Sequence, residues 1–215
     1  INLSGKGIQS GSALFVSPLQ IDFGKRTLYY TKEDSIKIRN IGFTNLSINS
    51  IILEGTDTDH IKITSSVTTP FSLSSLEEKT VKLQFTPKSI GQKQVILKIS
   101  SSDPVSPNAS VTVKGEGINP VLNLVTSVNF GNVGVNKQKD TIIIVKNQSE
   151  GAFEITNVSI SGNDQTSFSI DPRTNLGVLN PSESDTIYCK FSPTAKGEKN
   201  AFLNITINNM PSANS

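Results

Sequence analysis

The side chains best suited to acid–base or metal chemistry gather in one turn in the first half of the chain. His60 is the only histidine; it ends the run Gly55-Thr56-Asp57-Thr58-Asp59-His60, and Glu54 stands just before that run. Imidazole and carboxylate groups at this spacing could supply a general base or oxygen ligands for Ca²⁺. A triad or a histidine metal cluster needs further partners, and the acidic spacing is sparser than in known calcium loops. We therefore interpret the turn as solvated and His60 as an exposed loop residue.

The only thiol belongs to Cys189, in the run Ile187-Tyr188-Cys189-Lys190-Phe191. Strand alternation places Cys189 on the same side as Ile187 and Phe191, and the second half of the chain contains no histidine to activate it. We predict a buried, unreactive thiol rather than a nucleophile. A single cysteine also rules out an intramolecular disulfide, so the chain is not a small disulfide-rich secreted domain.

Two Gly-x-Gly pairs, Gly5/Gly7 and Gly115/Gly117, follow apolar alternation, as phosphate-binding loops do. No helical pattern follows either pair, so the helix N-terminus of a phosphate cradle is missing and we interpret both as hinges. The abundant Ser and Thr residues likewise have no activating base. The sequence therefore predicts no catalytic, cofactor-binding or metal-binding residue, no cofactor, and a protein that is not an enzyme.

The chain is organised around a motif that occurs twice. The run Leu83-Gln84-Phe85-Thr86-Pro87-Lys88-Ser89-Ile90-Gly91 returns as Cys189-Lys190-Phe191-Ser192-Pro193-Thr194-Ala195-Lys196-Gly197. Phe23 and Phe130 open the two copies at an offset of 107 residues, which a one-residue deletion reduces to 106 between Phe85 and Phe191. The chain is therefore an internal repeat of domain length.

Within each copy, short apolar runs alternate with polar residues, and Gly, Pro, Asn and Asp separate the runs. This period of two indicates half-buried β-strands, and no stretch has the spacing of an amphipathic helix. About seven such strands in roughly 100 residues predict an all-β fold: two tandem, immunoglobulin-like, seven-stranded β-sandwiches. We expect Phe23, Ile38, Leu53, Phe85 and Leu97 to form the core of the first sandwich.

The repeat register also predicts where the parts begin and end. Residues 1–8 match residues 111–118, which close the first copy, so they resemble the last strand of a preceding repeat. Residues 9–18 are then a linker, residues 19–118 the first repeat, and residues 119–215 a second repeat lacking its final strand. Two explanations stay open. The ends are boundaries within a longer array, or the unfilled position accepts a strand of another copy by donor-strand assembly.

Several of these motifs are shared with a known family. The chain resembles the Hydin-type ASH repeat, which is often called the choice-of-anchor D domain in bacterial proteins and is related to the major sperm protein fold. The motifs that carry the resemblance are Ile21-Asp22-Phe23-Gly24, Ile36-Lys37-Ile38-Arg39-Asn40, Leu46-Ser47-Ile48, Phe85-Thr86-Pro87, Gly91, Ser101-Ser102-Asp103-Pro104 and Gly115-Glu116-Gly117. The resemblance implies a seven-stranded sandwich used in tandem and without catalysis. It implies large secreted or surface proteins among bacteria, and cilia and centrosomes among eukaryotes.

The composition of the chain limits the classes of partner that it could bind. The formal net charge is only +2, and Lys and Arg are scattered, so no basic field for nucleic acid is present. No apolar run is long enough to cross a membrane. The runs Asp34-Ser35-Ile36, Asp140-Thr141-Ile142 and Asp185-Thr186-Ile187 resemble the O-glycosylation pattern of secreted Bacteroidetes proteins. We therefore expect an extracellular or cell-surface location.

We interpret the chain as a structural or interaction module of a repetitive bacterial surface or secreted protein, with a stalk, adhesion or fibre role. Its expected partners are other repeats of the same protein or other protein subunits, including head-to-tail self-assembly. Two alternatives stay open: an intracellular scaffold of ciliary or centrosomal type, and an accessory binding domain of a larger secreted enzyme. Tyr29-Tyr30, which has no aromatic counterpart in the second copy, is a candidate contact.

Overall fold

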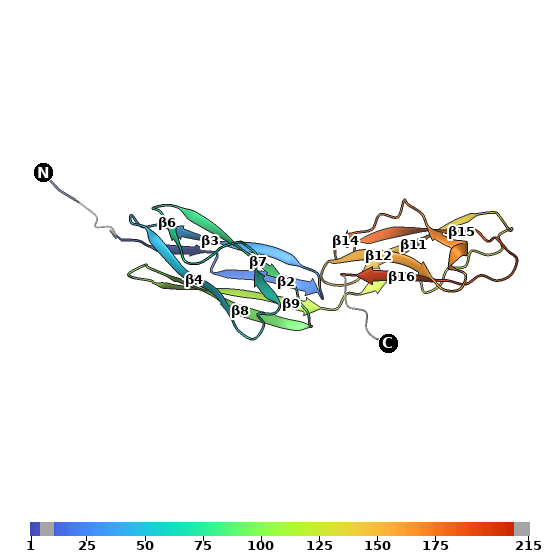
Figure 1. The fold of residues 1–215 in the computed structure, drawn as a ribbon, viewed down its shortest axis with the longest axis horizontal. Helices are drawn as coiled ribbons and strands as arrows, with labels where there is room; N and C mark the ends of the chain where they lie inside the picture. Colours follow the sequence, from blue (N-terminus) through green and yellow to red (C-terminus); the bar gives the residue numbers. More distant parts are fainter. Residues whose placement is uncertain (5–10, 209–215) are drawn as a thin grey trace. The chain divides into compact units, whose positions relative to one another are not determined.

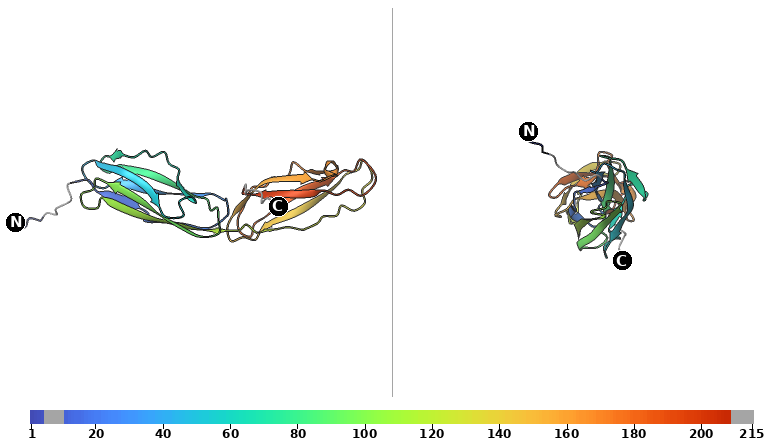
Figure 2. Two further views of the ribbon diagram at one scale, coloured as in Figure 1. Left: turned by 60° about the horizontal axis from the view of Figure 1, so that its bottom comes forward. Right: turned by 90° about the vertical axis from the view of Figure 1, so that its left-hand side faces the viewer.

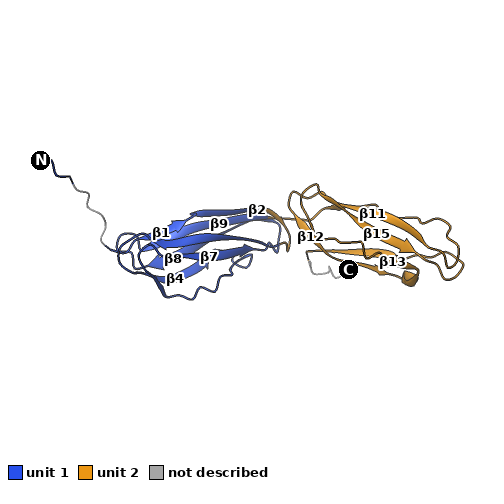
Figure 3. Ribbon diagram, turned by 90° about the horizontal axis from the view of Figure 1, so that it is seen from above, with its two compact units in different colours: residues 1–24, 31–116 blue, residues 25–30, 117–215 orange. Residues whose placement is uncertain are grey.

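The computed structural model describes residues 1–4 and 11–208, and the contacts among its residues divide the chain into two compact units. Unit 1 comprises Ile1–Gly24 and Thr31–Glu116, and unit 2 comprises Lys25–Tyr30 and Gly117–Ser215 (Figure 3). The chain therefore passes between the units three times. We describe each unit by itself.

Unit 1 is a sandwich of two sheets (Figure 1). One sheet has the order β1-β3-β7-β5 and the other the order β2-β9-β8-β4-β6. This arrangement corresponds to the two layers of an immunoglobulin-like fold. The strands are β1 (Leu14–Ser17), β2 (Gln20–Thr27), β3 (Lys32–Asn40), β4 (Leu46–Glu54), β5 (Ile61–Ile63), β6 (Phe71–Leu73), β7 (Glu78–Phe85), β8 (Gly91–Ser101) and β9 (Asn108–Ile118).

The core of unit 1 lies between these two sheets and follows the predicted alternation. Phe23, Ile38, Phe85 and Leu97 are at most 1% exposed, and Leu53 is partly buried against the same cluster. Period-two alternation directs every second side chain inward, and the large apolar residues at those positions fill the interior. The predicted core of the first repeat is therefore confirmed.

Unit 2 repeats the arrangement, with four strands in one sheet and three in the other (Figure 2). One sheet has the order β10-β11-β15-β13, and the other has the order β14-β12-β16. A single 3-10 turn, η1 (Gln165–Ser167), precedes β13. The strands are β10 (Leu122–Asn123), β11 (Lys139–Asn147), β12 (Phe153–Ser161), β13 (Phe168–Ile170), β14 (Val178–Leu179), β15 (Ser184–Phe191) and β16 (Phe202–Ile207).

The all-β prediction is confirmed, whereas the count of seven strands in each sandwich is not. Among the described residues, unit 1 has nine strands. Pro18 and Leu19 separate β1 from β2, which join different sheets, and two short strands, β5 and β6, lie between β4 and β7 in the chain. The predicted linker over residues 9–18 contains β1, whose Leu14–Ser17 pair with residues 37–40 of β3. Ile1–Ser4 are exposed and adopt no strand, and residues 5–10 of the predicted strand 1–8 lie outside the described residues.

The two sequence copies share unusual backbone positions at the repeat offset. Apart from Asn208, the residues with positive φ occur in pairs, which are Gly24/Gly131, Tyr29/Asn136, Gly55/Gly162, Leu76/Ser182 and Gly91/Gly197. Even the two non-glycine pairs match closely, with φ of 63° and 61° for Tyr29 and Asn136 and of 64° and 69° for Leu76 and Ser182. The sequence repeat is therefore also a repeat of turn geometry.

One fully buried asparagine anchors each sandwich. Asn40 donates from its side-chain amide to the carbonyl oxygens of Thr44 and Leu73, at 2.8 and 3.0 Å. Asn147 donates in the same way to Gly151 and Leu179, at 3.0 and 2.8 Å. Both side chains have 0% exposure, so these bonds satisfy carbonyls that water does not reach.

Residues 25–30 belong to unit 2 through specific hydrogen bonds. The hydroxyl of Thr27, which is fully buried, donates to the carbonyl of Ala152 at 2.6 Å. Asn208 donates from its side-chain amide to that hydroxyl and to the carbonyl of Leu28, at 2.8 and 2.9 Å. The Leu28 N–H in turn donates to the Ile118 carbonyl at 2.8 Å.

A search of the described residues for a long apolar helix able to cross a membrane finds none.

Candidate functional site

The histidine that we predicted to be an exposed loop residue is buried. His60 is 7% exposed, and its Nδ1 accepts a hydrogen bond from the Lys88 N–H at 3.0 Å. Its Nε2 lies 3.4 Å from a carboxylate oxygen of Asp59. The prediction of exposure was wrong because Lys88, 28 residues further along the chain, covers and fixes the ring. His60 therefore ties the turn to the segment after β7.

The acidic residues of this turn each have another partner. Asp57 accepts the Gln94 N–H at 3.0 Å, and Glu54 pairs with Lys98 at 2.6 Å. Asp59 lies between His60 and Lys88. Within residues 1–4 and 11–208, no group of three or more His, Cys, Asp or Glu is placed to hold a metal ion. The carboxylates of this turn thus fasten it to its neighbours.

Cys189 is 7% exposed on β15, as the alternation of its strand predicts. Burial raises the pKa of its thiol, so the thiolate needed for nucleophilic attack is disfavoured at neutral pH. Its counterpart in unit 1 is Leu83, which has 0% exposure. The predicted burial of the thiol is confirmed.

The candidate pair Tyr29-Tyr30 and a further aromatic residue, Phe71, are not free surface groups. Tyr29 and Tyr30 are half-buried, and the Tyr30 N–H donates to the Thr27 carbonyl at 3.1 Å to close a turn. Phe71 packs partly against the core of unit 1, and the Lys79 ammonium lies 4.5 Å from its ring centre. All three side chains therefore serve packing at least in part.

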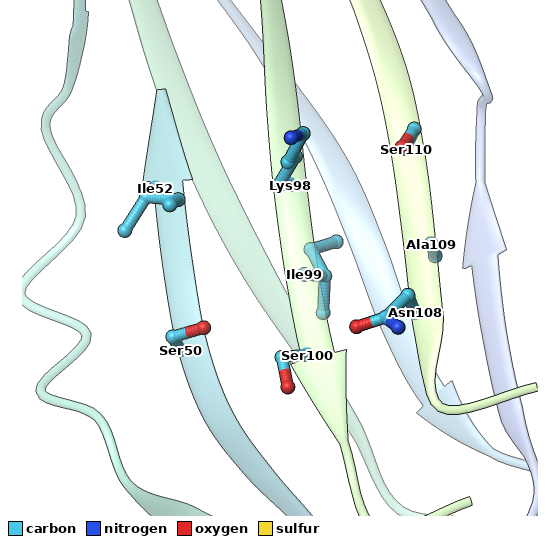
Figure 4. A pocket seen from close by; sticks show the side chains of 8 residues that line it. All are labelled: Ser50, Ile52, Lys98, Ile99, Ser100, Asn108, Ala109 and Ser110. Atoms are coloured by element: carbon cyan, nitrogen blue, oxygen red, sulfur yellow. The ribbon is translucent and has the colours of Figure 1, made fainter. Parts of the chain in front are cut away.

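One shallow hollow of about 410 Å³ lies on the outer face of unit 1 (Figure 4). Its polar side chains project from three neighbouring strands, with Ser50 on β4, Lys98 and Ser100 on β8, and Asn108 and Ser110 on β9. In Figure 4, Ile99 and Ala109 lie behind these strands, which agrees with their packing in the core. The hollow is thus a solvated strand surface.

A larger groove, of about 580 Å³, lies in unit 2 and has a lining of both apolar and polar residues. One wall is the irregular segment after β10, and the other is β16 with the residues just before it. The apolar lining includes Leu124, Val125, Val128, Phe130, Phe202 and Leu203. Val125 and Phe202 are 56% and 72% exposed, so the rim presents apolar surface to solvent.

The groove lies where unit 1 has a strand. In unit 1, β9 lies between β2 and β8, and it fills the space between them. In unit 2 the counterpart of β8 is β16, which pairs with β12 and ends its sheet (Figure 1). Along the part of the chain that the structure describes, no strand pairs with the second edge of β16. A strand edge without a pairing strand among the described residues, beside a partly apolar groove, is a geometry that can accept an added strand.

A charged cluster that the sequence analysis did not identify lies on the other sheet of unit 2. Asp171 is 6% exposed, and its carboxylate accepts Arg173 Nε at 2.9 Å and lies 2.6 Å from Lys190 Nζ. The Arg173 guanidinium, then Lys190 and the Arg173 N–H, hold the pKa of this carboxyl well below its usual range. The guanidinium also lies 4.7 Å from the ring centre of Tyr188. These bonds fix the loop after β13. In the sequence, only the spacing of Asp171/Arg173 and of Tyr188/Lys190 could have indicated this charged cluster.

Comparison with known proteins gives one family match. The model of the ASH family, described as abnormal spindle-like microcephaly-associated, ASPM-SPD-2-Hydin, matches residues 120–213. No curated protein sequence matches the chain.

Solved structures give low-identity likenesses. The chain is similar to a protein of unknown function from Porphyromonas gingivalis W83, with 15% identity, 83% of each chain covered and a TM-score of 0.41. It is similar to the ASH/PapD-like domain 7 of human CEP192, with 14% identity, 55% of this chain and 94% of that domain covered and a TM-score of 0.40. It is also similar to the secreted serine protease VesC from Vibrio cholerae, with 12% identity, 93% of this chain and 51% of the protease covered and a TM-score of 0.39.

ASH domains are immunoglobulin-like binding and interaction modules without catalysis of their own. The resemblance to the ASH repeat that the motifs indicate is thus confirmed over residues 120–213, the stretch that holds the strands and the groove of unit 2.

Proposed function

We propose that the chain is a non-catalytic structural and interaction module of a repetitive bacterial surface or secreted protein, in a stalk, adhesion or fibre role. The observation that carries the interaction role is the edge of β16 that no strand within residues 1–4 and 11–208 pairs, beside the groove of unit 2. Exposed strand edges are sites where proteins add a further strand, with backbone bonds for affinity and side-chain pockets for specificity. The partners are therefore β-strands of protein subunits, including repeats of the same kind.

Strand acceptance can be tested with a peptide that has the sequence of β9, residues 108–118. The labelled peptide should bind the 215-residue chain saturably in fluorescence anisotropy. Replacing the two exposed rim residues, Val125→Lys with Phe202→Lys, should weaken binding because it removes apolar surface without disturbing buried packing.

Ile142→Lys is the matched control, since Ile142 is an apolar side chain of β11 that is also 56% exposed and lies outside the groove. Binding that is absent, or that Ile142→Lys weakens as much as the rim substitutions do, would contradict the strand-accepting role.

The cellular setting is a separate part of the proposal. The O-glycosylation-like runs and the resemblance to the bacterial choice-of-anchor D domain support an extracellular or cell-surface location. The family description, which names spindle and Hydin proteins, favours the alternative of an intracellular scaffold. Protease treatment of intact source cells separates the two, because only a surface protein is cleaved while a cytoplasmic marker stays intact.

A further inference from the structure

The outer face of one sheet of unit 2 has an apolar patch, centred on β11. Ile142 and Ile144 are each 56% exposed, whereas Ile143 between them is 7% exposed and belongs to the core. Strand alternation therefore directs the first two side chains away from the core. On the neighbouring strand β15, the half-buried Tyr188 pairs with Ile142, and the half-buried Thr186 pairs with Ile144 (Figure 3). We call these four outward residues the β11 patch.

The corresponding face of unit 1 is polar. At the repeat offset of 107, Ser35 and Lys37 of β3 stand in place of the two isoleucines. Lys37 forms an ion pair with Glu78 at 2.8 Å, as is ordinary on a solvated sheet face. At the offset of 106, the exposed Lys82 stands in place of Tyr188. Single exposed apolar residues need no explanation, but neighbouring ones on a face that is polar in the other copy indicate a contact surface.

Opposite charges stand at the two ends of the isoleucine row. Asp140 lies two residues before the first isoleucine and Lys146 two residues after the second, so all four side chains share the outer face of β11. Asp140 accepts Gln138 Nε2 at 2.7 Å and lies 3.8 Å from Arg173 Nη2, yet its side chain is 48% exposed. Among the described residues, the Lys146 ammonium has no hydrogen bond or ion pair. The outer face of β11 therefore has the order negative, apolar, apolar, positive.

This order is complementary to itself when it is reversed. The Asp140/Lys146 pair and the Ile142/Ile144 pair are both centred on Ile143. Half a turn about an axis that crosses the strands at that point places Ile142 opposite Ile144 of a second copy. The same rotation places Asp140 opposite Lys146. An isologous dimer requires this property, because the same surface must serve on both sides of the contact.

We propose that the β11 patch docks the same patch of a second copy of the chain, about a twofold axis at Ile143. The two sheets stack face to face, about 10 Å apart, as the layers of a β-sandwich do. The isoleucines form the centre of the contact, and Tyr188 lies opposite Thr186 of the second copy. Two Asp140–Lys146 pairs close the ends. A patch of a few side chains supports a weak, reversible dimer.

The test is the molar mass of the 215-residue chain by sedimentation equilibrium over a concentration series. Because an isologous contact closes on itself, we expect the mass to rise toward twice that of the monomer and no further. Ile142→Lys should weaken dimerisation by at least about tenfold, because it removes apolar contact at two symmetric places. Ile52→Lys is the matched control, since Ile52 is 47% exposed on β4 of unit 1, and it should dimerise like the natural chain.

Charge reversal tests the twofold register. Asp140→Lys and Lys146→Glu should each weaken dimerisation of the variant with itself by about three- to tenfold, because each places like charges opposite each other twice. A mixture of the two variants should recover the natural affinity, since both facing pairs in the mixed dimer again have opposite charges. Loss of the Asp140–Arg173 contact within one chain could not produce this recovery.

Three results would overturn the inference: a chain that is monomeric at every concentration, assembly beyond a dimer, or dimerisation that Ile142→Lys leaves intact. A mixture of the charge variants that associates no more tightly than either variant alone would overturn the register. The groove variant, Val125→Lys with Phe202→Lys, should dimerise normally, and loss of the dimer in that variant would also overturn the inference. Failure of the β9 peptide to bind would contradict strand acceptance alone, because this dimer uses a sheet face and no strand edge.

Discussion

The two units have the same repeat but do not bury it equally. In unit 1, Val95, Leu97 and Ile99 of β8 are at most 1% exposed. Their counterparts in unit 2, Ala201, Leu203 and Ile205, are all only partly buried. The apolar pattern is similar in both copies. We attribute the difference in burial to β9, which lies beside β8 in unit 1 and has no counterpart beside β16 among the described residues. In a sandwich, the burial of a residue depends on its neighbouring strand as much as on its own type.

The largest expected effect is on the phenylalanine at the centre of each core. Phe85 has 0% exposure and stacks on Phe23 with ring centres 5.4 Å apart, so Phe85→Ala should reduce the unfolding free energy of unit 1 by about 3–5 kcal/mol. Phe191 is 9% exposed, and no strand among the described residues covers it in the way that β9 covers Phe85. Phe191→Ala should therefore reduce the unfolding free energy of unit 2 by less. Hydrogen exchange followed separately in the two units measures both losses. Equal losses of unfolding free energy in Phe85→Ala and Phe191→Ala would contradict the difference in burial between the two units.

A smaller effect, equal in the two units, is expected at the buried asparagines. Asn40→Leu and Asn147→Leu each leave two buried carbonyls without their donor, which should cost about 3 kcal/mol in either unit. Both side chains are fully buried in the structure, so the difference between the sheets of the two units should not matter here. Chemical denaturation monitored by exchange tests this, with substitution of the exposed Asn163 by Ala as the control. A much smaller loss in unit 2 would mean that its open groove admits water to these carbonyls.

The smallest effect concerns acid. The pKa of the Asp171 carboxyl is lowered in the folded state, so this group stabilises unit 2 above the ordinary carboxyl range. That contribution is lost as the pH falls from about 4 toward the lowered pKa. Unit 1 has Thr64 and Gln84 at the positions of Asp171 and Lys190, so it lacks this cluster. Asp171→Asn should therefore flatten the acid dependence of unit 2 alone. An unchanged pH profile for the unfolding of unit 2 would show that the cluster does not stabilise its fold.

Much of the fold could be predicted because its signals are local. Alternation and the repeat register locate most strands and the core residues of unit 1. The shape and lining of the groove could not be predicted, since they depend on the irregular path of residues 124–130.

The errors share a cause in contacts between distant residues. Leu14–Ser17 form β1 because β3 is available to pair with them, although the Ser- and Gly-containing run before them is typical of a linker. His60 is buried because the Lys88 N–H reaches its ring. No periodicity within either segment carries that information.

Residues 25–30, which belong to unit 2, determine where the chain could be divided into separately folded parts. Unit 2 does not coincide with the second sequence copy. Thr27 and Leu28 belong to the first copy, yet Thr27 donates to Ala152, and Leu28 accepts from Asn208 and donates to Ile118, all within unit 2. Dividing the chain after Ile118 would separate the two sequence copies. It would also remove Thr27 and Leu28, the hydrogen-bond partners of Ala152 and Asn208, from unit 2. The packing unit therefore includes residues that the sequence repeat assigns to the preceding copy.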